Sequence, residues 1–187
     1  DSQHYYPQMP YYLLPNIGSD DITTEVKSNY ILMPVAQAIQ QLDSYRDTIT
    51  IKSLLTTTED AYIENDPENS TWSKSADSET GAFDLGVSIT ETVDDKETQI
   101  IYFSSASMLS SQIDQAISGA NSKLAATALT SMCDVEQTVV IPSKSTSYTN
   151  LVFTQGAVNT WSIITIAGIP LVLVIVGMAI WMKRRKQ

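Results

Sequence analysis

Apolar and polar residues alternate in the middle of the chain, and this pattern predicts β-strands. Residues 84–92 (DLGVSITET) and 97–105 (ETQIIYFSS) are alternating and β-branched, and a polar turn at residues 93–96 joins them. Two such runs around a short acidic turn are typical of a β-hairpin. Residues 47–58 (DTITIKSLLTTT) alternate in the same way, so we expect a further strand there.

The second strand of this hairpin is apolar on both faces. Ile100 and Tyr102 belong to one face and Ile101 and Phe103 to the other, because side chains alternate along a strand. Strands buried on both sides show such continuous apolar runs. We therefore expect this strand to be central in its sheet, with both faces covered.

Helical spacing appears downstream of the hairpin. Residues 110–132 (SSQIDQAISGANSKLAATALTSM) predict a helix in two pieces, with a break near Gly119. The second piece carries an apolar stripe, formed by Leu124, Ala128, Leu129 and Met132. Residues 137–144 (QTVVIPSK) predict one more short strand. This order of strand, helix and strand is typical of an α/β layer structure.

The N-terminal part gives weaker signals. Pro7, Pro10 and Pro15 argue against regular structure in the first twenty residues. Residues 20–29 (DDITTEVKSN) predict a short helix, capped by one of its two leading aspartates.

Residues 30–42 (YILMPVAQAIQQL) are ambiguous. The first four residues resemble a buried strand, whereas the residues after Pro34 have helical spacing. Residues 64–80 show no periodicity and predict a surface loop.

A transmembrane helix is predicted near the C-terminus. Residues 163–182 are uncharged and almost entirely apolar, and twenty helical residues reach about 30 Å, the thickness of a bilayer core. Trp161 and Trp181 stand at the two ends, where their amphipathic rings favour the headgroup level. Pro170 lies inside the span, and membrane helices tolerate proline. Gly168 and Gly177 are candidate docking positions for another helix, because small residues permit close packing in lipid.

The basic residues after this span predict its orientation. They are Lys183, Arg184, Arg185 and Lys186. Short basic flanks remain on the cytoplasmic side, so we expect a cytoplasmic tail in the cell membrane and an extracytoplasmic bulk. The predicted organisation is a domain at 1–150, a juxtamembrane linker at 151–162, the span at 163–182 and the tail at 183–187.

The charge of the chain excludes some classes of partner. The formal net charge is −10, and it becomes −14 when the four basic tail residues are set aside. An acidic domain argues against nucleic acid as a partner. The chain starts with Asp1 and without a basic and apolar leader, so we expect it to be the C-terminal portion of a longer exported protein.

Candidate chemistry is sparse. His4 is the only histidine and lies in a loop rich in proline and tyrosine, which indicates a bystander. Cys133 is the only cysteine and follows the apolar helix stripe beside acidic residues, which favours a buried structural thiol. The acidic pairs lack the spacing of a calcium loop and are typical of solvated turns. A formal glycosylation sequon stands at 69–71. We expect no enzyme activity, no cofactor and no metal site.

The order of segments resembles the C-terminal half of the GldG-type auxiliary proteins of ABC transporters, which are named from gliding motility. The matching stretches are PYYLLP (10–15), ITIKSLLTTTEDAY (49–62), GAFDLGVSITE (81–91), IIYFSSASMLSS (100–111), VVIPSK (139–144) and IPLVLVIVGMAIWMKRRK (169–186). GAFDLG lacks both prolines of the usual family form.

The resemblance implies a mixed-sheet α/β domain of flavodoxin-like or glutamine-amidotransferase-like fold, here incomplete, ahead of the anchor. It also implies an ABC-2-type permease and, through it, a cytoplasmic ATPase as partners. The first hypothesis is thus a non-enzymatic auxiliary subunit that docks on or gates the permease. The alternative is a membrane-anchored binding module for a sugar, peptide or cell-wall ligand, independent of a transporter.

Overall fold

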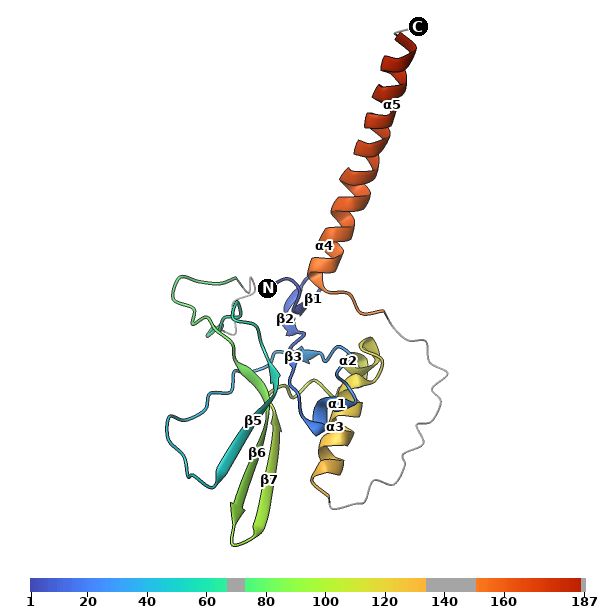
Figure 1. Ribbon diagram of the computed structural model, residues 1–187. Coiled ribbons are helices and arrows are strands. Elements are labelled where there is room, and N and C mark those ends of the chain that lie inside the picture. The colour runs from blue at the N-terminus through green and yellow to red at the C-terminus, as the bar shows by residue number, and fades with distance from the viewer. Residues whose placement is uncertain (67–72, 134–150, 186–187) are drawn as a thin grey trace.

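The computed structural model describes residues 1–66, 73–133 and 151–185. A mixed α/β domain stands at one end of a long C-terminal helix (Figure 1). The predicted strand at 137–144, the sequon at 69–71 and Lys186 lie outside the described residues.

The predicted hairpin is confirmed. β6 (Asp84–Val93) and β7 (Lys96–Phe103) pair antiparallel, with Val93 opposite Lys96 across a two-residue turn. Asp94 and Asp95 fill this turn with φ of 49° and 59°, which aspartate tolerates in hairpin turns. The third predicted strand is also present, as β5 (Ile49–Thr56), and pairs antiparallel with β6.

The prediction of a central second hairpin strand is wrong. Among the described residues, the four-stranded sheet has the order β3-β5-β6-β7, which places β7 at its edge. Ile100 and Tyr102 are 56 % and 48 % exposed, whereas Ile101 and Phe103 pack against the core. The apolar run therefore buries only one of its two faces.

Short strands form in the first twenty residues in spite of the prolines, contrary to expectation. They are β1 (Tyr5–Tyr6), β2 (Met9–Leu13) and β3 (Asn16–Ile17). β1 contacts β2 in an irregular register, with Tyr5 opposite Leu13 and Tyr6 opposite Met9. Pro10 is in neither of these pairs. Its missing N–H therefore removes no bond between β1 and β2, and β2 can form.

Residues 30–42 form neither of the two long elements that the pattern allows. Only Met33–Pro34 are a strand, β4, which completes a second antiparallel sheet in the order β1-β2-β4. The predicted helix is absent: Val35 has φ of 48°, and Ile39 forms an isolated bridge with Asp84. A left-handed residue directly after Pro34 turns the chain away from a helix.

The helix predictions are largely confirmed. α1 (Asp21–Thr24) begins after Asp20, whose side chain forms a capping box with Thr23. α2 (Ser111–Ala116) and α3 (Ala120–Ser131) are separated at Gly119, which has φ of 83°. The predicted stripe on α3 is wrong in its second half, because Leu129 and Met132 are exposed while Leu124 and Ala128 are buried.

The core lies where the two small sheets meet α1, α2 and α3. Its buried apolar residues are Leu14, Ile22, Val26, Ile31, Leu32, Met33, Leu54, Leu55, Leu85, Met108, Ile117, Ala120, Leu124 and Ala128. All strand pairs among the described residues are antiparallel. A flavodoxin-like sheet is built from parallel strands, so this detail of the predicted fold is not confirmed.

Candidate functional site: the anchor and its junction with the domain

The C-terminal helix is long and apolar enough to cross a membrane. α4 (Gln155–Ile163), a π-helical turn at Ile164–Gly168 and α5 (Ile169–Arg185) form one continuous helix of 31 residues. Its most apolar stretch has no part buried within the chain, and Figure 1 shows it projecting away from the domain. A helical stretch that no other described part of the chain covers, and that is apolar on all sides, is suited to lipid.

Aromatic and basic residues mark the ends of this helix. The side chains of Trp161 and Trp181 are 63 % and 58 % exposed. They are therefore free to lie at the headgroup level of a bilayer, where tryptophan is enriched. Lys183, Arg184 and Arg185 occupy the last turn, where cations favour the negative end of the helix dipole. The Arg185 guanidinium lies over the Trp181 ring, 5.3 Å from its centre, and this is a cation–π contact.

The π-helical turn lies directly before Pro170. Its closing bond runs from the Ile169 N–H to the Ile164 carbonyl, which is one residue longer than an α-helical bond. Proline has no N–H and its ring clashes with the carbonyl four residues earlier. The wider turn therefore accommodates Pro170 without breaking the helix.

Gly168 and Gly177 do not share a face of the helix. An α-helix rotates about 100° per residue, so nine positions place the two glycines on opposite sides. Nothing lies within 4 Å of a Cβ built at either position. A single partner helix can therefore use one glycine or the other, but not both.

The first turn of the anchor is bonded to the N-terminal strands. The Gly156 N–H donates to the Ser2 carbonyl at 2.7 Å. The Gln8 N–H donates to Gln155 Oε1 at 2.8 Å. Residues at the two ends of the domain are thus joined, and the start of the helix is fixed to the β1–β2 hairpin.

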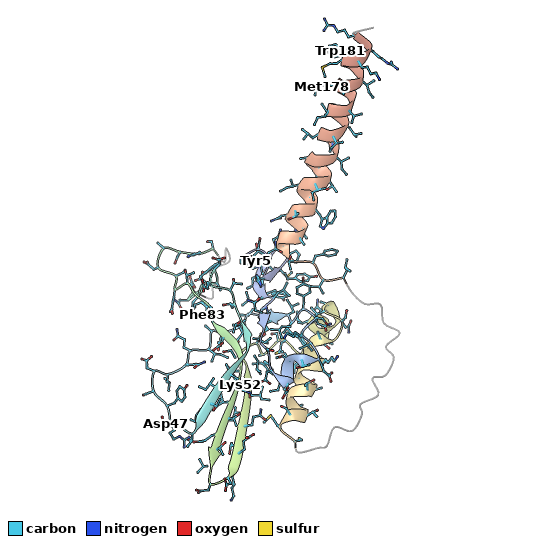
Figure 2. All side chains as sticks on the ribbon, in the orientation of Figure 1. Tyr5, Asp47, Lys52, Phe83, Met178 and Trp181 are labelled. Carbon is cyan, nitrogen blue, oxygen red and sulfur yellow. The ribbon has the colours of Figure 1, made fainter. Side chains whose placement is uncertain are left out.

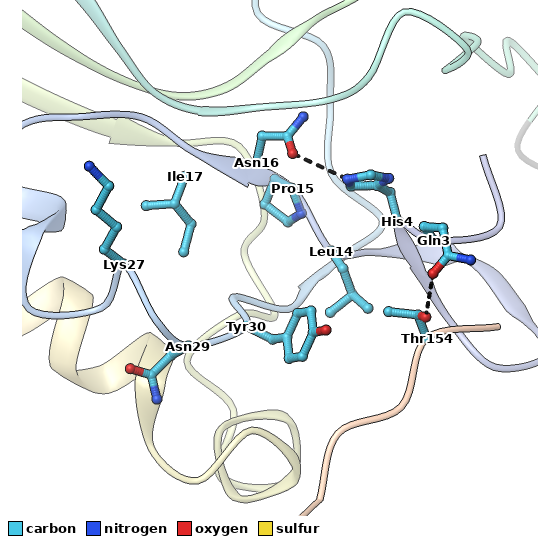
Figure 3. A pocket seen from close by; sticks show the side chains of 10 residues that line it. All are labelled: Gln3, His4, Leu14, Pro15, Asn16, Ile17, Lys27, Asn29, Tyr30 and Thr154. Carbon is cyan, nitrogen blue, oxygen red and sulfur yellow. Dashed lines mark hydrogen bonds between the residues drawn. The ribbon is translucent and has the colours of Figure 1, made fainter. Parts of the chain in front are cut away.

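Thr154 serves both the helix and the domain. Its Oγ1 accepts from the Ala157 N–H at 3.2 Å, which caps the helix. The same hydroxyl donates to Gln3 Oε1 at 3.0 Å, the contact drawn on the right of Figure 3. Gly156 is buried against this pair, and a Cβ there would lie 1.8 Å from Gln3 Nε2. Only glycine fits without displacing Gln3.

A pocket of about 450 Å³ adjoins the junction (Figure 3). Its lining residues are Gln3, His4, Leu14, Pro15, Asn16, Ile17, Lys27, Asn29, Tyr30 and Thr154. His4 lies 2.8 Å from Asp1 Oδ2 through Nδ1 and 3.1 Å from Asn16 Oδ1 through Nε2. The only histidine therefore joins β3 to the residues before β1.

Cys133 and Tyr62 are the remaining candidate groups. Cys133 is exposed, so the prediction of a buried thiol is wrong: α3 ends two residues earlier and its last turn leaves the core. Burial raises the pKa of the Tyr62 phenol, with smaller contributions from Glu64 and Tyr5, so this group stays protonated at neutral pH. Within the described ranges, no three His, Cys, Asp or Glu side chains are grouped to hold a metal.

The sequence predicted the anchor residues but not the junction. Gln3, Gln8 and Gly156 carry no local signal, because their partners are about 150 positions away. Thr154 was detectable, since threonine ahead of an apolar helical run is a typical N-cap.

Comparison of this chain with protein-family models, curated proteins and solved structures finds no match in any of the three. The geometry of the anchor and its junction is therefore the basis for a functional hypothesis.

Proposed function

We propose that this protein is a non-enzymatic, membrane-anchored auxiliary subunit of an ABC-2-type transporter. Its α/β domain lies outside the cytoplasm and docks on or gates the permease, which in turn binds a cytoplasmic ATPase. The anchor crosses the cell membrane once, with Lys183, Arg184 and Arg185 on the cytoplasmic side. The fold class and the apolar helix agree with this proposal, and the resemblance to GldG-type proteins motivates the choice of transporter.

The rigid junction is the observation that carries the proposal. Two backbone N–H groups, of Gly156 and Gln8, donate across the junction between the helix and the N-terminal residues. The Thr154 hydroxyl adds a third bond, to Gln3. A module that only captures a ligand needs no fixed angle to the membrane, and a flexible linker serves it well. A subunit that gates a membrane partner needs a fixed angle, because force and position must pass from the domain to the permease.

The pocket at the junction favours the second candidate function. Its lining combines amides, hydroxyls, an imidazole and one lysine with the apolar Leu14, Pro15 and Ile17, and a mixed lining of this kind can hold a small ligand. The protein would then be a membrane-anchored binding module for a sugar, peptide or cell-wall ligand. The flavodoxin-like or glutamine-amidotransferase-like fold remains a prediction under either function.

Purification of the tagged full chain from native membranes tests the proposal. We expect an ATPase and a multi-span permease to co-purify with it in fixed proportion. Gly177→Leu and Gly168→Leu enlarge opposite faces of the anchor where nothing lies within 4 Å, so neither substitution disturbs the chain itself. One of the two is expected to weaken co-purification about tenfold, since close helix packing in lipid requires small residues.

The matched control is Ala167→Leu, which adds similar volume at a position about 100° around the helix from Gly168 and about 80° from Gly177. Purification without any ATPase or permease contradicts the transporter assignment. Unchanged co-purification of both glycine variants reduces the helix to a plain tether.

A further inference from the structure

Two segments without charged side chains meet where the domain joins the anchor. Residues 2–13, which include β1 and β2, hold no Asp, Glu, Lys or Arg, and neither do residues 151–163, which lead into and form α4. The hydrogen bond from the Gln8 N–H to Gln155 joins the two segments across 147 positions. We call this region the anchor end of the domain.

The opposite end of the domain is charged. Asp94 and Asp95 form the turn between β6 and β7, and Lys96 and Glu97 follow it at exposed positions. Figure 1 shows this turn at the end of the domain farthest from α4, and the β1–β2 hairpin at the foot of α4. The uncharged segments and the charged turn are thus separated along the direction of the anchor.

The length of α4 sets the height of the anchor end above a bilayer. The headgroup layer is about 5–8 Å thick on each side of the hydrocarbon core, which equals about four or five helical residues. With the predicted span beginning at Ile163, this layer corresponds to residues 158–162, where Trp161 lies among polar side chains. Gln155 then stands about 5 Å outside the layer, because each helical residue rises about 1.5 Å.

Three exposed apolar side chains lie next to the first turn of the anchor. Met9 directly follows Gln8, which is bonded to this turn. Phe153 precedes the cap of α4, and Val158 lies within α4. We call Met9, Phe153 and Val158 the apolar collar. Figure 2 shows Tyr5 at the same place, beside the lower end of α4. The remaining distance to the headgroups is within the length of one such side chain.

Uncharged aromatic and apolar side chains are suited to the boundary between headgroups and water. Tyrosine is enriched there because its ring is apolar and its hydroxyl is polar, and four of the nine tyrosines of the chain lie in the β1–β2 hairpin. Exposed apolar residues alone are common on protein surfaces. The position of the apolar collar decides, because the anchor brings the bilayer surface within its reach.

The charge of a neighbouring loop selects the kind of lipid. Glu64 and Tyr5 both contribute to the raised pKa of the Tyr62 phenol, which places this carboxylate near the anchor end. A carboxylate there repels anionic headgroups but not zwitterionic ones. The anchor end is therefore suited to a zwitterionic bilayer surface.

We propose that the anchor end of the domain rests on the bilayer, with the apolar collar of Met9, Phe153 and Val158 in contact with zwitterionic lipid headgroups. This contact holds the domain against the membrane in addition to the bonds of the junction. The proposal rests on the membrane crossing in the proposed function and not on the transporter partner.

Fluorescence quenching of the full chain in phosphatidylcholine nanodiscs tests this contact. In a Cys133→Ser chain, a single cysteine replaces Met9 or Phe153 and carries a fluorophore, while the lipid headgroups carry a nitroxide quencher. Glu97→Cys at the far end of the domain is the matched control, because Glu97 is also exposed. Trp161→Cys reports insertion of the anchor.

We expect headgroup quenching at positions 9 and 153 to be about fivefold stronger than at position 97, because the headgroup layer extends only about 5–8 Å from the hydrocarbon core. This quenching should fall when anionic lipid is added. Equal quenching at positions 9, 153 and 97, with strong quenching at position 161, overturns the proposal and leaves the membrane crossing intact.

Absence of quenching at position 161 contradicts the membrane crossing itself, and with it this proposal. Stronger quenching at position 9 in anionic lipid overturns the choice of zwitterionic headgroups.

Discussion

Asn121 holds Leu32 in the centre of the core by two hydrogen bonds. The Leu32 N–H donates to Asn121 Oδ1 at 3.2 Å, and Asn121 Nδ2 donates to the Leu32 carbonyl at 2.7 Å. The same amide donates to the Met108 carbonyl at 2.7 Å. Leu32 lies outside any strand, so its buried backbone has no ladder to join. A side chain on α3 replaces the missing neighbour strand.

Replacement of this amide should be among the most destabilising single changes in the domain. Asn121→Leu leaves three buried backbone groups without their partner, at about 1–3 kcal/mol for each such group. We expect the free energy of unfolding to fall by about 3 kcal/mol. Urea denaturation followed by near-ultraviolet circular dichroism of the tyrosines measures it. The exposed Asn29→Leu serves as control, and an equal effect of both changes contradicts the role of Asn121.

Two adjacent isoleucines on β7 should respond differently to the same substitution. Ile101 packs against the core, so Ile101→Asp buries a charge and should cost about 3 kcal/mol of unfolding free energy. Ile100 is 56 % exposed, so Ile100→Asp should cost less than about 1 kcal/mol. Measurement of the melting temperatures of the two variants and of the parent chain compares these costs directly. Equal loss at both positions would show that the strand is covered on its two faces.

The junction predicts a fixed distance between domain and anchor. Spin labels at Ser122 and Ile175, in a Cys133→Ser chain, should give a narrow distance distribution by pulsed electron resonance. Gly156→Val should broaden it, because its side chain displaces Gln3 from Thr154. A broad distribution in the parent chain contradicts the rigid junction.

The exposed thiol offers a direct test of topology. Cys133 lies on the domain surface and should react with a membrane-impermeant maleimide in intact cells. In a Cys133→Ser chain, a cysteine at position 187 should react only after the membrane is opened, since the basic tail is expected inside. The opposite labelling pattern would reverse the proposed orientation.

The sequence by itself determined the local elements. The β6–β7 hairpin, β5, the break at Gly119, the α1 cap at Asp20 and the apolar anchor each depend on neighbours within a few positions. Turn chemistry, capping and periodicity act over this range, so they can be read directly from the order of residues.

The tertiary structure decided which faces are covered and how distant segments join. The apolar pattern of β7 fits a central strand and an edge strand equally well, and only the strand order distinguishes them. The packing of Ile101 against the core then decides which face of β7 is covered. Cys133 is exposed because α3 ends just before it. The bonds of Asn121 to Leu32 and of Gly156 to Ser2 cross about 90 and 150 positions. No local pattern encodes such contacts, because they exist only after the chain has folded.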